Sequence, residues 1–413
     1  MVGLVAGCRA CGGRLTVTMA DLGMQPASNA FLDSPAAISG EKRYPLRAKV
    51  CESCKLVQVD YDVAPEELFG NYVYFSSYSD DWLNHAKQYC EMARRRFALH
   101  SESLVVELAS NDGYLLKNFL TMGIPVLGID PSDTVAAAAE KIGVATLVEF
   151  FGENVARDLV RHRRQADLII ANNVLAHVPQ LNDFVSGIAL LLRASGSVTI
   201  EFPHLLELIE HVEFDTIYHE HFSYFSLHAI EQVFSRHGLR IYDLERLPTH
   251  GGSLRIFAAH ASRTDLQESA LLREVRMQET AAGIPELATY LQFAKRVDAC
   301  RDSVLDFLKV AKREGKRVAA YGAAAKGNTL LNFCGVTPED ISLVADRNPH
   351  KQRKLLPGTH IAVVSPEELM QSKPDYVLIL PWNLRDEIRQ QLDGIKAWGG
   401  RFVTPVPLIR VYS

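Results

Sequence analysis

Titratable and aromatic side chains are concentrated in residues 218–225, which read Tyr-His-Glu-His-Phe-Ser-Tyr-Phe. Histidine titrates near neutral pH, and a neighbouring carboxylate can orient it or tune its pKa. His219 and His221 are two residues apart, whereas a helical zinc pair needs a spacing of four. We therefore interpret the segment as an acid/base group. The alternative is that these side chains are structural polar residues on the surface or in the core.

Four of the seven cysteines form two CxxC pairs, Cys8 with Cys11 and Cys51 with Cys54. Each pair can direct two thiolates at one ion, and two pairs complete a tetrahedral zinc site. The residues between the pairs (12–50) are rich in turns and poor in apolar side chains, so a metal would stabilise a segment that lacks a large core. A redox dithiol is the alternative, but it needs a βαβ context and no second copy. Because four thiolates leave no open position, we predict structural zinc.

Residues 103–131 have the pattern of a mononucleotide-binding unit. The apolar runs 104–109 and 125–129 predict two buried parallel strands, joined by a small-residue turn and a helix. Asp130 follows the second strand, where an acidic residue can accept hydrogen bonds from ribose hydroxyls. Glycine would be favoured in the turn at positions 109, 111 and 113, which are occupied by Ala109, Asn111 and Gly113.

This unit suits a cationic cofactor better than a pyrophosphate, because its turn is poor in glycine and it carries the acidic Glu107 and Asp112. We therefore predict S-adenosylmethionine rather than NAD. The expected cofactor-binding residues are Glu107, Ala109, Asn111, Gly113, Asp130 and Asn172. His177 and Glu201 follow or end later predicted strands, and ligands bind at the carboxyl ends of strands in open α/β sheets.

Four motifs occur together over essentially the whole chain: the paired cysteines, residues 107–114 (Glu-Leu-Ala-Ser-Asn-Asp-Gly-Tyr), residues 218–225 and residues 322–328 (Gly-Ala-Ala-Ala-Lys-Gly-Asn). In this combination the sequence resembles the bacterial sugar C-methyltransferases that build branched deoxysugars, and most of all the tetronitrose C-3′-methyltransferase type. The resemblance implies methylation at C3 of a TDP-linked 4-keto-6-deoxy sugar through deprotonation of C3 and an enolate.

The resemblance also implies the roles of individual residues. His221 falls on the catalytic base, assisted by Glu220 and Tyr218, and His177 falls on a histidine beside the cofactor. The aromatic cluster at residues 72–78 supplies a lid tyrosine, Tyr72, and a contact to the substrate, Tyr78. Packing without a role in the reaction is the alternative for this cluster.

The carboxyl-terminal third repeats the plan of the central unit, with predicted strands at residues 316–322, 341–346 and 375–380. Its turn begins a helix, where backbone N–H groups and a lysine can hold a diphosphate. We hypothesise that this part binds the nucleotide of the sugar substrate. The residues concerned are Lys326, Asn328, Asn348, Lys351 and Asn383. The alternative is a Rossmann-like domain that only supports the fold.

Length and composition agree with a multidomain α/β protein. The 413 residues carry a net charge of −5, which gives no positive field for nucleic acid, and no apolar run is long enough to span a membrane. We expect a zinc module (1–70), a Rossmann-like S-adenosylmethionine-dependent methyltransferase domain (71–262) and a Rossmann-like domain (263–413) in a cytoplasmic protein, with a monomer as the simplest state. O- or N-methylation, or sugar-nucleotide binding without catalysis, are the alternative functions.

Overall fold

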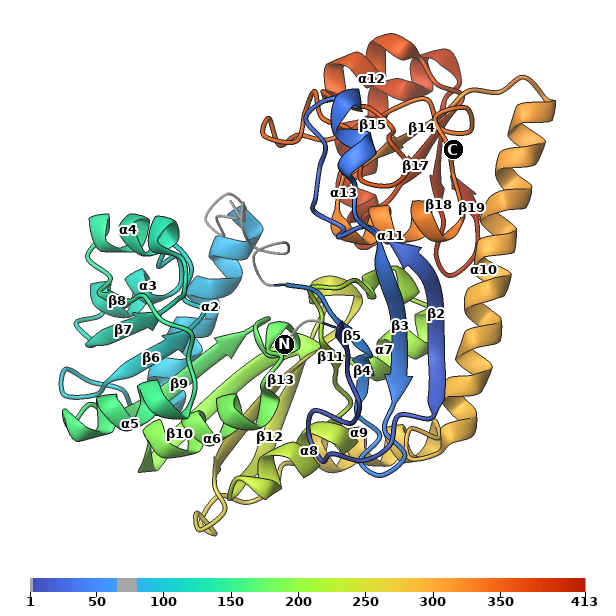
Figure 1. Ribbon diagram of the computed structural model, residues 1–413. Helices are drawn as coiled ribbons and strands as arrows, with labels where there is room; N and C mark the ends of the chain where they lie inside the picture. The colour runs from blue at the N-terminus through green and yellow to red at the C-terminus, as the bar shows by residue number, and fades with distance from the viewer. Residues whose placement is uncertain (1–2, 65–79, 413) are drawn as a thin grey trace.

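The computed structural model describes residues 3–64 and 80–412, and Figure 1 shows them arranged in three parts. The amino-terminal strands, in blue, lie between a central α/β domain in cyan, green and yellow and a carboxyl-terminal α/β domain in orange and red. A long helix, α10 (Leu287–Arg313), runs beside strand β2 (Val17–Gln25) and leads into the carboxyl-terminal domain. The predicted α/β fold class, with an amino-terminal module and two Rossmann-like parts, is confirmed.

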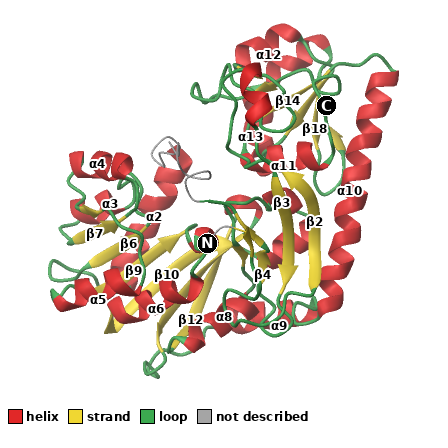
Figure 2. Ribbon diagram, in the orientation of Figure 1, coloured by secondary structure: helices red, strands yellow, loops and turns green. Residues whose placement is uncertain are grey.

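The central domain is built on a seven-stranded sheet in the order β12-β13-β10-β9-β6-β7-β8 (Figure 2). Its strands are β6 (Val105–Leu108), β7 (Val126–Ile129), β8 (Thr146–Leu147), β9 (Ala166–Asn172), β10 (Leu192–Pro203), β12 (Leu239–Leu247) and β13 (Ser253–His260). Strand β13 is antiparallel to both of its neighbours, and the other neighbouring strands are parallel. The chain order reverses between β6 and β9, which is where open α/β sheets bind their ligands.

The apolar runs predicted as strands are buried because helices cover the sheet. All four residues of β6 and of β7 are buried. The helices of this domain are α2 (Asp80–Arg96), α3 (Leu116–Thr121), α4 (Asp133–Lys141), α5 (Glu153–Arg161), α6 (Leu181–Leu191), α7 (Leu205–His211) and α8 (Leu227–Arg236).

The amino-terminal sheet contains one strand from the central domain. Strands β2, β3 (Tyr44–Val50) and β4 (Val57–Val59) are joined at the edge by β11 (Ser223–Tyr224), in the order β11-β4-β3-β2. In the antiparallel pairing, Ser223 lies opposite Gln58 and Tyr224 opposite Val57. A second, two-stranded sheet pairs β1 (Gly3–Leu4) with β5 (Tyr61–Asp62). The segment rich in titratable residues is therefore hydrogen-bonded to the amino-terminal module.

The carboxyl-terminal domain has a six-stranded sheet in the order β16-β15-β14-β17-β18-β19. Its strands are β14 (Val318–Tyr321), β15 (Val344–Ala345), β16 (Val363–Val364), β17 (Tyr376–Ile379), β18 (Arg401–Thr404) and β19 (Arg410–Tyr412), and its helices after α10 include α11 (Ala325–Phe333), α12 (Pro366–Ser372) and α13 (Arg385–Gln391). The first five strands repeat the order of β8-β7-β6-β9-β10. This agreement matches the repeated plan that the sequence predicted for the carboxyl-terminal third.

One hydrophobic core joins the three parts. Leu46 of β3, Phe214 of the central domain and Leu331 of α11 all belong to the same buried cluster. Helix α9 (Ala270–Ala281), predicted within the third domain, packs on α8 and β12 of the central domain. In the parts of the chain that the structure describes, no helix is both long and apolar enough to cross a membrane.

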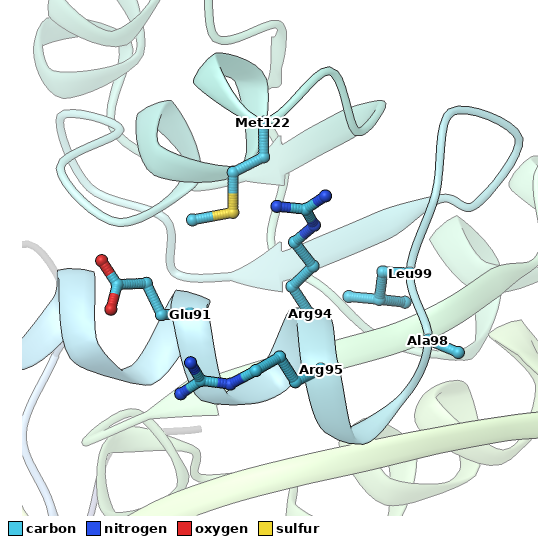
Figure 3. A pocket seen from close by; sticks show the side chains of 6 residues that line it. All are labelled: Glu91, Arg94, Arg95, Ala98, Leu99 and Met122. Atoms are coloured by element: carbon cyan, nitrogen blue, oxygen red, sulfur yellow. The ribbon is translucent and has the colours of Figure 1, made fainter.

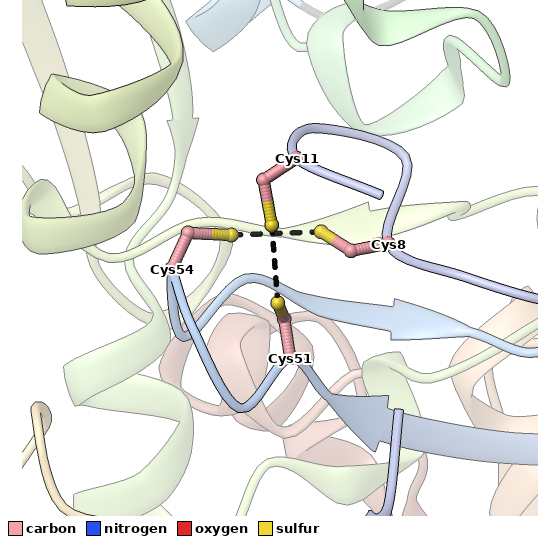
Figure 4. A group of neighbouring side chains, drawn as sticks. All are labelled: Cys8, Cys11, Cys51 and Cys54. Atoms are coloured by element: carbon pink, nitrogen blue, oxygen red, sulfur yellow. Dashed lines mark hydrogen bonds between the residues drawn. The ribbon is translucent and has the colours of Figure 1, made fainter. Parts of the chain in front are cut away.

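The four paired cysteines meet at one point, as Figure 4 shows. Their Sγ atoms all lie within 4.8 Å of one another, with 3.5 Å between Cys8 and Cys54 and 3.4 Å between Cys11 and Cys51. A zinc ion bound tetrahedrally at about 2.3 Å from each thiolate requires sulfur–sulfur separations of about 3.8 Å. The sulfur positions therefore fit a four-cysteine zinc site, which leaves no coordination position for substrate.

We expect Cys51→Ser to remove about one equivalent of zinc per chain and to lower Tm by about 5–10 °C, because the metal joins the two halves of a module with a small core. Metal content by mass spectrometry and a thermal melt measure both effects. Cys334→Ser, at a buried cysteine outside the cluster, is the matched control and should retain zinc. A Cys51→Ser protein with parental zinc content would contradict the assignment.

Candidate functional site

The segment 218–225 is fixed by backbone hydrogen bonds on both sides. The N–H of Phe222 donates to the carbonyl oxygen of Ala176 over 2.7 Å, and the carbonyl oxygen of Phe222 accepts from the N–H of Val59 over 3.1 Å. The first bond connects the segment to the turn after β9, which carries His177. The second connects it to the zinc module. Both parts of the chain therefore set the position of His221.

The hydrogen bonds of His221 define its tautomer. Its Nδ1 lies 3.0 Å from the carbonyl oxygen of Thr216, which can only accept, so Nδ1 carries the proton. Its Nε2 lies 2.8 Å from the hydroxyl of Tyr218, so the lone pair of Nε2 accepts the O–H. The two rings lie with their centroids 4.0 Å apart. Nε2 is thus the basic atom of a Tyr218–His221 pair.

Burial beside a second imidazole keeps His221 neutral. The ring of His177 lies 4.8 Å from that of His221, centroid to centroid, in an edge-to-face contact. Burial, together with the charge of His177, holds the pKa of His221 well below its usual value. Burial also lowers the pKa of His177 to about 4. Both imidazoles are therefore uncharged at neutral pH, which is the form a general base requires.

His219 and Glu220 face the amino-terminal module. His219 Nε2 donates to the carbonyl oxygen of Pro45 over 3.2 Å. Both carboxylate oxygens of Glu220 accept from the amide nitrogen of Asn29 at 2.9 Å, and burial raises the pKa of Glu220 to about 7. Within the segment, Tyr218 and His221 thus lie toward His177, whereas His219 and Glu220 lie toward the zinc module. A role for Glu220 in assisting the base stays a prediction.

The turn at residues 109–114, which is predicted to bind the cofactor, has the backbone shape expected where glycine would be favoured. Ala109, Asn111 and Gly113 all have positive φ, at 54°, 49° and 76°. The N–H of Asn111 donates to Asp130 Oδ2 over 2.9 Å, and the N–H of Ser132 donates to Asp130 Oδ1 over 3.0 Å. The carboxylate after the second strand therefore holds the turn close to the strand ends.

This turn fits a ligand that is cationic and rich in hydroxyl groups. Burial, and after it the negative charge of Asp130, raise the pKa of Glu107 well above its usual value. Within the described residues, Glu107 Oε2 and Asn172 Oδ1 are buried without a hydrogen-bond partner. A buried acceptor that lacks a donor is costly, and S-adenosylmethionine brings a positive charge and ribose hydroxyl donors. The residues therefore fit the predicted cofactor.

The residues predicted to bind the nucleotide lie in three places. Lys326 Nζ donates to Asn383 Oδ1 over 2.7 Å and lies 4.4 Å from the centre of a ring of Trp382. Lys351 Nζ donates to the carbonyl oxygen of Ala323 over 2.8 Å, at the carboxyl end of the sheet. Asn348 follows Asp346 there, and its N–H donates to Asp346 Oδ1 over 2.8 Å.

Asn328 points elsewhere. Its side chain is only 1% exposed, and its amide nitrogen donates to the carbonyl oxygen of Ser28 over 2.6 Å. It therefore supports the contact between α11 and the amino-terminal module, and the substrate contact of Asn328 stays a prediction. Tyr72 and Tyr78 lie outside the described residues, so their roles also stay predictions.

Charged residues that the sequence analysis missed surround Lys326. Burial lowers the pKa of Lys326, whereas the carboxylates of Asp215 and Glu213 act in the opposite direction. Burial raises the pKa of Glu213 to about 8, and Trp382 Nε1 donates to Asp215 Oδ2 over 2.8 Å. These carboxylates follow α7 in the chain, a place that no motif marked.

His250 is a further histidine of this region, and the sequence analysis missed it. The central domain places it in the turn between β12 and β13. Glycines 251 and 252 follow it directly, and this was the one available indication of an unusual backbone.

One hollow of the structure lies beside the residues described above, and another lies away from them. The first, of about 260 Å³, lies between the central and carboxyl-terminal domains and is lined in part by Glu213, Gly251 and Trp382. The second, of about 360 Å³, lies along α2 and contains none of the predicted site residues (Figure 3). Its lining residues are Glu91, Arg94, Arg95, Ala98, Leu99 and Met122.

Three protein families match successive parts of the chain. A "Putative zinc binding domain" matches residues 8–69, a "Methyltransferase domain" matches residues 82–244, and a "C-methyltransferase C-terminal domain" matches residues 248–407. The order of the three agrees with the order of the three parts in the structure.

A relative that matches almost the whole chain shows the family to which it belongs. The chain is 35% identical over 406 residues to the C-methyltransferase NovU of Streptomyces niveus, covering 98% of this chain and 96% of NovU. A ubiquinone biosynthesis O-methyltransferase of Rhodopseudomonas palustris is 27% identical over 117 residues, covering 27% of this chain and 46% of that protein. The PH0226 protein of Pyrococcus horikoshii OT3 covers 48% of this chain and 96% of its own, at 16% identity and a TM-score of 0.37. The chain therefore belongs to the deoxysugar C-methyltransferase family that its motifs predicted, and it is an S-adenosylmethionine-dependent C-methyltransferase with a zinc-binding amino-terminal domain.

Proposed function

We propose that the enzyme methylates C3 of a TDP-linked 4-keto-6-deoxy sugar, in the biosynthesis of a branched deoxysugar. The observation that carries this proposal is the Tyr218–His221 pair, in which the carbonyl of Thr216 fixes the proton on Nδ1 and leaves Nε2 as the base. Methyl transfer to oxygen or nitrogen can use a lone pair already present on the acceptor. Transfer to carbon needs a carbanion equivalent, and hence a base beside the reacting carbon.

The reaction is possible because the 4-keto group makes the hydrogen on C3 weakly acidic. His221 Nε2 takes the C3 proton, and the electron pair of the broken C–H bond moves into an enolate between C3 and the C4 oxygen. The Nδ1–H of the resulting imidazolium still donates to Thr216, which stabilises the new charge. Bound S-adenosylmethionine would supply the methyl group: the enolate restores the C4 ketone as C3 bonds to the methyl carbon, the sulfonium C–S bond breaks, and S-adenosylhomocysteine leaves. Burial of His221 disfavours a long-lived imidazolium and so favours return of the proton to solvent.

The carboxyl-terminal domain supports binding of the nucleotide diphosphate. Lys326 is the second residue of α11, and the N–H groups in the first turn of a helix lack partners within the helix. Its ammonium group lies beside Trp382 and Asn383, next to the hollow between the domains. We therefore assign the sugar to the His221 side of this region and the nucleotide to the Lys326 side, with Lys351 and Asn348 at the neighbouring strand end.

The parent enzyme should exchange the C3 hydrogen of its keto sugar with deuterated water, as measured by NMR or mass spectrometry. We expect His221→Asn to slow this exchange and methyl transfer together by about 10²–10⁴-fold, because the amide is not a base. His162→Asn, at an exposed histidine on the end of α5, is the matched control and should leave both rates unchanged. Methyl transfer without C3 exchange would indicate O- or N-methylation instead.

We expect Lys326→Ala to raise KM for the sugar nucleotide by about 10-fold or more, because it removes the cation assigned to the diphosphate. KM for S-adenosylmethionine should change far less, and steady-state kinetics with each substrate varied in turn compares the two. Lys354→Ala, on the same domain but paired with the exposed Asp33, is the control. Equal effects on the two KM values would refute the assignment of Lys326.

A further inference from the structure

His250 lies in a backbone conformation that ordinary residues rarely adopt. Its φ of 57° and ψ of 20° are left-handed, within the short turn Thr249–Gly251. Such a conformation costs free energy in a residue with a Cβ atom and persists only where the surroundings impose it. Strained residues of this kind are enriched at functional sites.

Close packing imposes the shape of this turn. A Cβ atom at Gly251 would lie 2.5 Å from Glu213 Oε1 and 2.7 Å from Trp382 Cη2. A Cβ atom at Gly252 would lie 2.6 Å from Glu207 Cγ. The two glycines thus let the turn press against the central domain on one side and against Trp382 of the carboxyl-terminal domain on the other. As a result, His250 is held firmly at the contact between the two domains.

The side chain of His250 connects the cofactor turn with the catalytic histidines. Its ring makes an edge-to-face contact with Trp82, at 6.0 Å between centroids, and Trp82 stacks on Tyr114 of the cofactor turn at 6.3 Å. On its other side, His250 is close enough to His177 and His221 for its charge to lower the pKa of each. The methyl donor and the base must meet in this region if the proposed reaction occurs.

The ring of His250 is available to a ligand. Within residues 3–64 and 80–412, no hydrogen bond to it is formed, and the residue is open to solvent although protein surrounds it on its remaining sides. The neighbouring Thr249 is engaged, because its hydroxyl donates to Glu201 Oε1 over 3.1 Å. A fixed imidazole with available nitrogens, within electrostatic range of the proposed base, is placed to contact reacting atoms.

We propose that His250 is a catalytic residue that donates an N–H hydrogen bond to the C4 oxygen of the sugar as that oxygen becomes an enolate. This inference rests on the proposed function, which requires the enolate. The proton of the N–H stays on His250 throughout. The C3 proton goes to His221, and the electron pair it leaves behind is stabilised on the C4 oxygen by the donor.

The neutral form of the ring suits this role. The surrounding protein desolvates the ring and, together with the charge of Lys326, lowers the pKa of His250 to about 4, so the imidazole at neutral pH has one N–H and no charge. Donors fixed in advance at a developing oxyanion contribute about 10²–10³-fold to a rate. The imposed turn supplies such fixation, which explains why a strained backbone is retained there.

Two variants separate the imidazole from the backbone. His250→Gly keeps the left-handed turn without strain and removes the ring, whereas His250→Asn tolerates the same conformation and keeps an N–H donor. We expect His250→Gly to slow C3 exchange and methyl transfer by about 10²–10³-fold, and His250→Asn to slow them less. The Kd for S-adenosylmethionine and Tm should stay near parental values, and His162→Asn should match the parent.

Parental rates of C3 exchange in His250→Gly would overturn the proposal. A loss of rate in that variant accompanied by an equal loss of affinity for S-adenosylmethionine, or by a large fall in Tm, would also overturn it, since the role would then be structural. Absence of C3 exchange in the parent enzyme with any TDP-linked keto sugar is a different result. It would refute the proposed function itself, and the role of His250 with it.

Discussion

The structure depends on the addition of one short strand, β11, to the sheet of the amino-terminal module. Ser223 and Tyr224 pair with β4, and the two residues before them are His221, the proposed base, and Phe222, whose carbonyl also bonds to Val59. A loop of the central domain would otherwise have to hold the proposed catalytic side chains by its own packing. Here a sheet edge stabilised by the cysteine cluster fixes the loop from one side, and the turn after β9 fixes it from the other.

This arrangement explains why a zinc-binding domain accompanies a complete methyltransferase fold. The cysteines lie in turns beside the module's strands, and Cys54 lies just before β4 in the chain. The amide of Asn182 in the central domain donates to the carbonyl oxygens of Arg9 and Ala10 at 3.0 Å, which secures the first cysteine turn against α6. The cysteine turns, β4 and β11 thus form a continuous series of contacts between the cysteine cluster and the segment that carries His221.

Much of the site could be predicted from the sequence because it follows local rules. The strand, turn and acidic residue around Asp130 form a contiguous pattern, and the positive φ values at Ala109, Asn111 and Gly113 fall where that pattern favours glycine. Contacts between distant segments could not be predicted in this way. The pairing of Glu220 with Asn29 depends on the register of β11 against β4, which no periodicity encodes. His250 lies in the turn between β12 and β13, and the shape of this turn is imposed by Trp382, a residue of another domain.

The electrostatics of the site keep His221 uncharged and disfavour a proton held on it. His177, His250 and Lys326 all act to lower the pKa of His221, which burial lowers further. The nearby carboxylates are directed to other partners: Glu201 to His85 and Arg255, and Asp215 to Trp382. An imidazolium at His221 therefore gains stability mainly from the carbonyl of Thr216. Because the hydroxyl of Tyr218 occupies Nε2, the proposed reaction requires this hydroxyl to turn aside before C3 approaches, and its O–H would then donate to the sugar instead.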